Sequence, residues 1–232
     1  EKTARVYGDH CLLTSNRNVM ADINKIFQFL EYPEKGYGPL ERCNTLMVSP
    51  ISMRTGIEGL INHEIKQAKA GKKAAITIKL NSLSDVSLIK KLNDAAVAGV
   101  TINMIVRGIF CALVDHKKFN TKPRAISIVD EYLEHARVMI FHNGGNEKVF
   151  ISSADWMVRN IDHRIEAAVP IQDPVIKAEL QDIIHIQLQD NVKARVLDSD
   201  LLNNYVPSGS KKKLRSQIET YLYLQQKTNT KK

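Results

Sequence analysis

Residues 135 to 166 bring together side chains whose types suit phosphate chemistry. His135 and Arg137 stand two residues apart at the start of an expected strand, so both can point to one face. An imidazole can act as nucleophile or as acid and base near neutral pH, and a guanidinium presents a permanent fork of donors to phosphate oxygens. The spacing therefore predicts a place where a phosphoryl group binds.

Further polar groups follow in the same stretch. The turn from Ser152 through Ser153 to Asp155 offers hydroxyl and backbone N–H donors, and it is equally typical of a helix N-cap. Glu166 stands two residues after Arg164 on a second expected strand, so we expect both on one face, with Glu166 orienting the ring of His135. A surface histidine that is merely hydrogen-bonded would show the same spacing, so spacing alone leaves both interpretations open.

The elements that must position these groups follow from hydrophobic periodicity, which alternates between helical and extended and is typical of an α/β fold. Strands are expected at 45–48, 74–80 and 100–106, with a helix ending at Gly71 and another over 86–98 between them. Such β-α-β-α-β connections imply a largely parallel sheet flanked by helices, with ligands beyond the carboxyl ends of its strands. Arg107 lies at one of those ends.

Later segments complete the expected architecture. Extended stretches are expected at 125–129, 137–141, 148–152 and 164–169. Asp173 and Pro174 form an N-cap followed by a favourable first helical residue, and a last basic helix is expected over 210–225. The Gly- and Pro-rich segment 33–40 is the expected domain boundary in the first half of the chain.

Composition excludes several classes of protein. The chain has 232 residues, of which 44% are hydrophobic and 25% charged, as in a globular protein and unlike a disordered or fibrous one. Its apolar runs stop far short of the roughly 20 residues that span a bilayer. Three widely separated cysteines fit neither a disulfide framework nor a zinc site, and no P-loop, GxGxxG, HExxH or CxxC motif occurs.

The net charge of +8 is concentrated at one end of the chain. From residue 207 onward there are seven Lys or Arg residues against one acid, Glu219. Such a segment attracts polyanions, and it is also typical of a solvated helix with a frayed end. Both interpretations remain open.

Several motifs carry a family resemblance. The order HxR, SSADW and RNIDHRIE resembles the second half-site of the phospholipase D-like superfamily, with Arg137 in place of its Lys and Asp155 in place of its Asn. The stretches EKTARVYGD, NMIVRGI, RAISIVDEYLEH and FHNGGNEKVFISSADWMVRNIDHRIE resemble the C-terminal half of bacterial polyphosphate kinases, and the resemblance runs nearly end to end.

That resemblance implies a phospholipase D-like mixed α/β fold in three parts. Residues 1–40 would be the end of a first such domain, 41–206 a second and catalytic one, and 207–232 a basic helix and tail. The implied reaction is reversible transfer of the ATP γ-phosphoryl group to inorganic polyphosphate, through a phosphohistidine upstream of Glu1.

The resemblance also implies roles for particular residues. His135 would be catalytic, assisting proton transfer or holding the transferring group. The residues implied around ATP and phosphate are Tyr7, Arg107, His135 and Arg164, with Arg137, Ser153, Asp155 and Glu166 in support. Mg²⁺ is expected for the full-length enzyme with its ligands outside this chain, so no metal ligand is assigned here.

Partners and alternatives complete the expectation. ATP or ADP and polyphosphate are the expected partners, and no binding of nucleic acid is expected. The full-length protein is expected to be a cytoplasmic homo-oligomer that associates at most peripherally with membranes. The chain alone is expected to fold without catalysing the reaction. A phospholipase D-like phosphodiesterase or nuclease remains an alternative, against which Arg137 and Asp155 count. A non-catalytic polyanion-binding module is another, against which an aromatic content of 6% counts.

Overall fold

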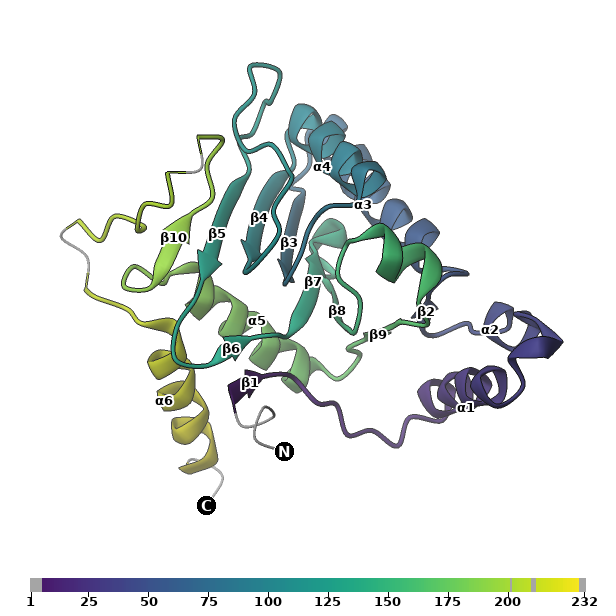
Figure 1. The fold of residues 1–232 in the computed structure, drawn as a ribbon. Coiled ribbons are helices and arrows are strands. Elements are labelled where there is room, and N and C mark those ends of the chain that lie inside the picture. The colour runs from purple at the N-terminus through teal and green to yellow at the C-terminus, as the bar shows by residue number, and fades with distance from the viewer. Residues whose placement is uncertain (1–5, 201, 210–211, 230–232) are drawn as a thin grey trace.

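An eight-stranded sheet in the order β10-β5-β4-β3-β7-β8-β9-β2 runs through the centre of the molecule (Figure 1). The computed structural model describes residues 6–200, 202–209 and 212–229. The strands of this sheet are β2 (Met47–Val48), β3 (Ala75–Leu80), β4 (Thr101–Val106), β5 (Arg124–Ile128), β7 (Arg137–Phe141), β8 (Lys148–Ser152), β9 (Ala167–Pro170) and β10 (Ala194–Val196). A separate two-stranded ribbon pairs β1 (Tyr7–Gly8) with β6 (Leu133–Glu134).

Helices flank the sheet. The α-helices are α1 (Arg17–Glu31), α2 (Gly38–Glu41), α3 (Met53–Lys69), α4 (Val86–Ala98), α5 (Pro174–Leu188) and α6 (Ser216–Asn229). The shorter turns are η2 (Pro33–Lys35) and η3 (Asn143–Gly145), which are 3-10 helical, and η4 (Arg159–His163), which is π-helical. No helix in the described ranges is both long and apolar enough to cross a membrane.

Strand pairing confirms the mixed α/β class and limits its parallel part. β3 pairs with β4, and β4 with β5, in parallel, whereas the other pairings of this sheet are antiparallel. The expectation of a largely parallel sheet therefore holds only around β4. Short connections such as residues 142–147 between β7 and β8 can join antiparallel neighbours only, because a parallel pair needs a long crossover. β2 lies at the far edge beside β9, away from β3.

The β3-α4-β4 unit follows its sequence closely. Ile76 and Ile78 alternate with Lys79 along β3, so the isoleucines join the apolar layer under α3 and α4 while Lys79 faces the opposite side. The Asp85 side chain caps α4 by accepting a 3.0 Å hydrogen bond from Leu88 N. Gly99 ends the helix at φ 94°, a left-handed conformation that glycine adopts without strain.

The opposite face of the sheet is covered by α5. Leu180 and Ile184 of this helix share an apolar cluster with Ile105, Ile126 and Val138 of the sheet. The Asp173 side chain caps α5, accepting 2.8 and 3.0 Å hydrogen bonds from the backbone N–H groups that follow, as expected. The molecule therefore has three layers, with α6 packed on α5 outside them.

Two expected elements differ from the structure. The strand expected at 164–169 starts only at Ala167, because residues 159–163 form η4 and Arg164 ends it. The last helix, expected over 210–225, occupies Ser216–Asn229. Residues 210 and 211 lie outside the described ranges, and residues 212–215 have no regular secondary structure.

The first helix packs against the remainder of the chain. Val19 and Phe29 of α1 share an apolar cluster with Leu46 and Val48, and Val169 packs against it. The division at residue 40 stays a prediction.

Candidate functional site

The β1–β6 ribbon brings the segment around Tyr7 to His135. Tyr7 pairs with Leu133, and Gly8 O accepts hydrogen bonds from the backbone N–H groups of His135 and Ala136 at 3.3 and 3.1 Å. The rings of Tyr7 and His135 meet edge to face with centroids 4.7 Å apart. Two of the expected site residues, far apart in sequence, therefore lie in contact.

Asp9 orients the His135 ring. Its Oδ1 and Oδ2 lie 2.9 and 3.2 Å from Nδ1 of His135, while Arg137 Nη1 lies 3.4 Å from the same nitrogen. An arginine can only donate, so Nδ1 cannot serve both neighbours in one tautomer. The shorter contacts to Asp9 favour a proton on Nδ1, which leaves Nε2 as the ring nitrogen that can meet a substrate.

Glu166 does not orient His135, contrary to expectation. Its carboxylate accepts hydrogen bonds from Ser153 Oγ and, at 2.7 Å, from Asn160 Nδ2. Ser153 Oγ in turn accepts from Ala167 N at 3.1 Å. The expectation was wrong because it assumed a regular strand from Arg164, whereas the π-helical turn changes the direction in which Glu166 points. Glu166 and Ser153 instead secure the start of β9.

Arg137 and Asp155 form a paired support beside the ring. Arg137 Nη2 donates to Asp155 Oδ2 at 3.1 Å, and Asp155 Oδ1 accepts from the backbone N–H groups of Asn81 and Ser82 at 2.7 and 3.1 Å. Asp155 is 7% exposed. Through Asp155, the Ser-Ser-Ala-Asp turn therefore holds both the residues that follow β3 and the side chain of Arg137.

Arg107 is held from one edge of its guanidinium. Its Nε donates to Asn81 Oδ1 at 3.2 Å and to Glu134 O at 3.1 Å, and Asn81 Nδ2 donates to His135 O at 3.2 Å. No described residue is hydrogen-bonded to its two terminal nitrogens, which remain able to bind phosphate oxygens. Gly108 permits this close packing, because a Cβ there would lie 2.9 Å from Asn81 O.

Arg164 stands apart from this group. Its side chain is exposed and makes no hydrogen bond or ion pair with any residue in the described ranges. The turn before it is held by Arg54, which donates to Asp162 at 2.6 and 3.0 Å and to Asp85 at 2.7 and 2.9 Å. These hydrogen bonds, first those that Arg54 donates to Asp85, raise the pKa of Arg54 above its ordinary value. The predicted phosphate role of Arg164 stays a prediction.

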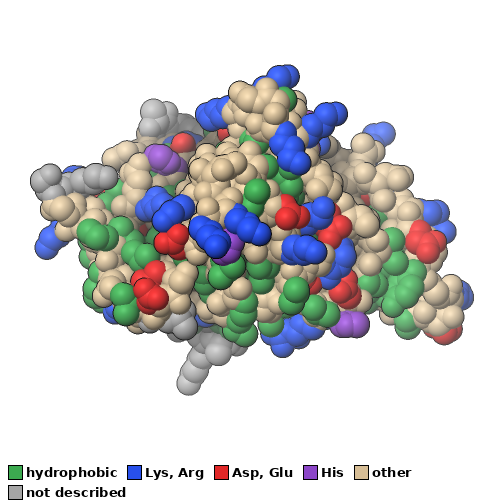
Figure 2. Space-filling model, turned by 90° about the horizontal axis from the view of Figure 1, so that it is seen from above, with side chains coloured by type: hydrophobic (Ala, Val, Ile, Leu, Met, Phe, Trp, Pro, Cys, Tyr) green, Lys and Arg blue, Asp and Glu red, His purple; other side chains and the backbone are tan. Residues whose placement is uncertain are grey.

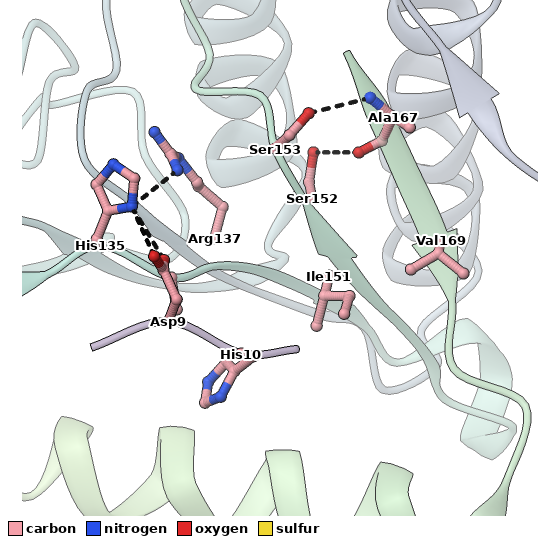
Figure 3. Close-up of a pocket in the computed structure, with 10 residues that line it drawn as sticks. Asp9, His10, His135, Arg137, Ile151, Ser152, Ser153, Ala167 and Val169 are labelled. Carbon is pink, nitrogen blue, oxygen red and sulfur yellow. Dashed lines mark hydrogen bonds and ion pairs between the residues drawn. The ribbon is translucent and has the colours of Figure 1, made fainter. Parts of the chain in front are cut away.

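A cavity of about 320 Å³ opens beside His135. In Figure 3, Asp9, His135 and Arg137 meet on one side, and Ile151 and Val169 lie across from them. The remaining lining residues are His10, Ala136, Ser152, Ser153 and Ala167. The cavity thus joins one charged wall to one largely apolar wall.

Sequence analysis missed two residues of this site. Asp9 and Asn81 contact His135 or its backbone, yet neither was among the expected site residues. Asp9 directly follows the Tyr7-Gly8 pair of a family-like stretch, which is the one signal that could have drawn attention to it.

Positive charge is not confined to the C-terminal segment. Figure 2 shows Lys and Arg side chains gathered near the middle of one face, with a histidine among them and acidic side chains between and around them.

In the C-terminal segment itself, Arg215 is paired with Asp130 and Glu131. Arg215 therefore belongs to an internal ion pair instead of a free basic tail.

The residues that the structure describes offer no cluster of metal ligands. Within the described ranges no group of three or more His, Cys, Asp or Glu side chains could hold a metal ion. Asp9, the carboxylate beside the cavity, is engaged with His135. No step is therefore assigned to a metal held by this chain alone.

Comparison with known proteins gives a consistent result. Residues 46–217 match the family model described as polyphosphate kinase C-terminal domain 2. The polyphosphate kinase of Vibrio parahaemolyticus is 51% identical over 225 residues, and that of Escherichia coli K12 is 45% identical over 224; each alignment covers 97% of this chain and 32% of the relative.

A solved structure agrees. The crystal structure of polyphosphate kinase from Porphyromonas gingivalis superposes with a TM-score of 0.88 at 42% sequence identity, over 94% of this chain and 33% of that one. This chain spans about a third of the length of the relatives it matches. By sequence and by structure, it belongs to the polyphosphate kinase C-terminal domain 2 family.

Proposed function

We propose that this chain supplies part of the active site of a polyphosphate kinase that transfers the γ-phosphoryl group of ATP reversibly to inorganic polyphosphate. The observation that carries the proposal is the cluster of His135, Asp9, Tyr7 and Arg107 in a member of this family. The proposal extends to residues 1–40 as the end of a preceding domain and to a phosphohistidine outside this chain.

In this proposal His135 works through Nε2. Asp9 holds the proton on Nδ1, so Nε2 is the atom that can donate a proton to, or accept one from, an oxygen of the transferring group. The side-chain exposure of 28% leaves the ring accessible from the cavity. His135 is thus suited to acid and base chemistry or to binding the phosphoryl group.

Arg107 would stabilise charge in the same place. Its Nε is already bound by Asn81 and Glu134, so the guanidinium is oriented before substrate arrives. A preorganised donor costs no reorganisation when negative charge develops on the phosphoryl oxygens. Arg137 contributes less directly, because Asp155 already neutralises it.

The remaining expectations belong to the same proposal. Magnesium would be bound largely outside this chain. The full-length protein would be a cytoplasmic homo-oligomer, with at most peripheral membrane association and no nucleic-acid substrate. Gathered Lys and Arg side chains support binding of a polyanion such as polyphosphate (Figure 2).

The decisive experiment replaces His135 by alanine in the full-length protein. We expect loss of most polyphosphate synthesis from ATP, corresponding to about 3 to 5 kcal/mol of transition-state stabilisation. The control is His185→Ala, which removes an exposed histidine of α5 and should leave the rate unchanged.

Labelled ATP distinguishes the possible roles of His135. If its role is not nucleophilic, mass spectrometry places the acid-labile label of the wild type on a histidine other than His135; a label on His135 of the wild type would make it the nucleophile. Normal polymer synthesis by His135→Ala, or phosphodiester hydrolysis without polymer synthesis by the wild type, would contradict the proposal.

A further inference from the structure

The C-terminal segment lies against the residues that lead into His135. Arg215 donates to Asp130 through Nε and Nη2, both at 2.8 Å, and to Glu131 at 3.1 Å. The Arg215 hydrogen bonds lower the pKa of Asp130 below its ordinary range, so the pair stays charged at neutral pH. Segment 130–134 is therefore fixed at its start by the residue just before α6.

Gln217, in the first turn of α6, holds the next part of this segment. Its Oε1 accepts from Tyr132 N at 3.0 Å, and its Nε2 donates to Tyr132 O at 2.8 Å. The same Nε2 donates to Glu134 Oε1 at 2.8 Å. One amide thus satisfies both backbone groups of Tyr132 and one oxygen of Glu134.

Glu134 connects Gln217 to the residues around His135. Its carboxylate is buried, with Lys79 Nζ and Gln187 Nε2 each 2.9 Å from Oε2. Its backbone oxygen accepts from Arg107 Nε, and the next residue is His135. Fixing Glu134 therefore fixes an acceptor for Arg107 and the backbone that carries His135.

The ribbon needs such support because it is short. β6 has two residues and pairs only with the two residues of β1, so its own ladder provides little rigidity. Burial lowers the pKa of Lys79, and the charge of Glu134 acts in the opposite direction, so the buried pair is favourable only while both partners stay in place. Gln217 supplies a donor that no neighbouring strand provides.

We infer that Gln217 is a positioning residue for His135 and Arg107, so that helix α6 contributes to phosphoryl transfer without touching the substrate. The inference rests on the proposed function for its catalytic part. It assigns α6 a role beyond stabilising the fold, because the hydrogen bonds of Gln217 end on Tyr132 and Glu134.

The test compares two substitutions on the same helix in the full-length protein. Gln217→Ala removes the contacts to β6, whereas Tyr223→Phe removes a 2.6 Å hydrogen bond between α6 and Asp182 of α5, away from β6. We expect Gln217→Ala to lower kcat for polyphosphate synthesis by about tenfold or more with little change in KM for ATP, since small displacements of catalytic groups have effects of this size. Tyr223→Phe should stay within about twofold of wild type.

A second readout reports on His135 without requiring turnover. Diethyl pyrocarbonate acylates neutral imidazole, so its rate at His135, measured by mass spectrometry across pH, reports the exposure and proton affinity of that ring. Gln217→Ala should change this profile, whereas Tyr223→Phe should reproduce that of wild type. Gln217→Glu keeps the side-chain length but places a carboxylate beside Glu134, so it should change the profile at least as much.

The outcomes separate this inference from the proposed function. If wild type makes polymer but both Gln217 variants match Tyr223→Phe in kcat and acylation profile, the positioning role is wrong and the proposed function stands. If wild type makes no polymer yet the Gln217 variants change the His135 profile, the positioning role stands and the proposed function fails. Should Gln217→Ala lower the melting temperature well beyond Tyr223→Phe, kcat and the acylation profile are compared at a temperature where circular dichroism shows both variants to be fully folded.

Discussion

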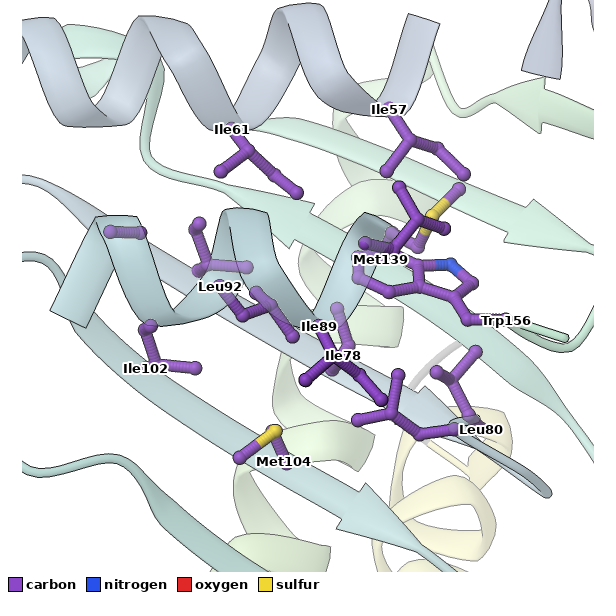
Figure 4. Packing of buried hydrophobic residues seen from close by; sticks show 14 of the residues in the cluster. Ile57, Ile61, Ile78, Leu80, Ile89, Leu92, Ile102, Met104, Met139 and Trp156 are labelled. Atoms are coloured by element: carbon purple, nitrogen blue, oxygen red, sulfur yellow. The ribbon is translucent and has the colours of Figure 1, made fainter. Parts of the chain in front are cut away.

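The β3-α4-β4 unit and the β1–β6 ribbon are held together in different ways. In the former, Ile78 of β3 and Leu92 of α4 are buried together, in one apolar cluster with Ile57 of the neighbouring helix α3 (Figure 4). In the latter, strands of two residues are held by Asp9, Gln217 and Glu134 through hydrogen bonds.

This difference separates the sources of stability and of chemistry. Apolar burial depends on area and tolerates small displacements, whereas hydrogen bonds depend on direction and fix an atom in one place. The regular unit therefore provides the stable frame, and the ribbon provides the geometry around His135. Substitutions in the β3-α4-β4 unit should therefore lower stability, whereas substitutions around the ribbon should lower activity.

The largest expected effect comes from paired substitutions in the two regions. Ile78→Ala, at a fully buried position, should lower the free energy of unfolding by about 2 to 5 kcal/mol. Asp9→Asn, at a side chain 50% exposed, should lower it by less than about 1 kcal/mol but reduce polyphosphate synthesis by about tenfold or more. Urea denaturation and a polymer assay measure the two quantities.

The exposed Val86→Ala, expected within about 0.5 kcal/mol of wild type, is the control for loss of apolar side chains. If Ile78→Ala and Asp9→Asn lower the free energy of unfolding equally, the β3-α4-β4 unit and the β1–β6 ribbon do not differ in their contribution to stability.

An intermediate effect is expected from replacing arginines by lysine. Arg107→Lys keeps the charge but loses the contacts to Asn81 and Glu134 together with the fork, so activity should fall at least about tenfold. Arg164→Lys loses no internal contact in the described ranges, and a fall of about tenfold there would come from phosphate binding alone. Steady-state rates at several ATP concentrations measure both variants. If both behave like wild type, the forked hydrogen bonds of the guanidinium groups are not needed for phosphate binding.

The smallest expected effect concerns pH. Burial, and then the charge of Lys79, lower the pKa of His10 below its ordinary value of 6.5. The unfolded chain therefore binds more protons than the folded one below pH 6.5, and the free energy of unfolding should fall with falling pH by at most about 1.4 kcal/mol per unit from this group.

His10→Gln removes this titration. As pH decreases below 6.5, the free energy of unfolding of His10→Gln should fall less steeply than that of wild type. Near pH 8, the pH dependence of the two free energies should have the same slope. Chemical denaturation across this range measures both, and parallel curves from pH 8 to 5 would show that His10 is not held neutral by the fold.

Much of the regular frame was predictable from sequence. The bounds of α4, β7 and β8 agree with expectation, and the cap at Asp173 lies where the sequence indicates it. These features depend on periodicity and on side chains that bond to backbone a few residues away, so the information is local.

The site was predictable in part. The placement of His135 and Arg137 at a strand, and the proximity of Tyr7 and Arg107 to His135 implied by family resemblance, agree with the structure. The partner of His135 was predicted wrongly, because assigning it to Glu166 required a regular strand from residue 164 and the chain forms a π-helical turn instead.

Residue types by themselves determined the alternation of helices and strands, the α/β class and the placing of His135 beside Arg137. The mixed sheet and the roles of Tyr7, Arg107 and Arg164 were implied by the family resemblance. Tertiary structure decided which groups meet: Asp9 with His135, Gln217 with Glu134, and Glu166 with Asn160 instead of His135. Local periodicity is set by backbone geometry over a few residues, whereas a polar contact across many residues depends on every turn between its partners. A single π-helical turn was therefore enough to redirect Glu166.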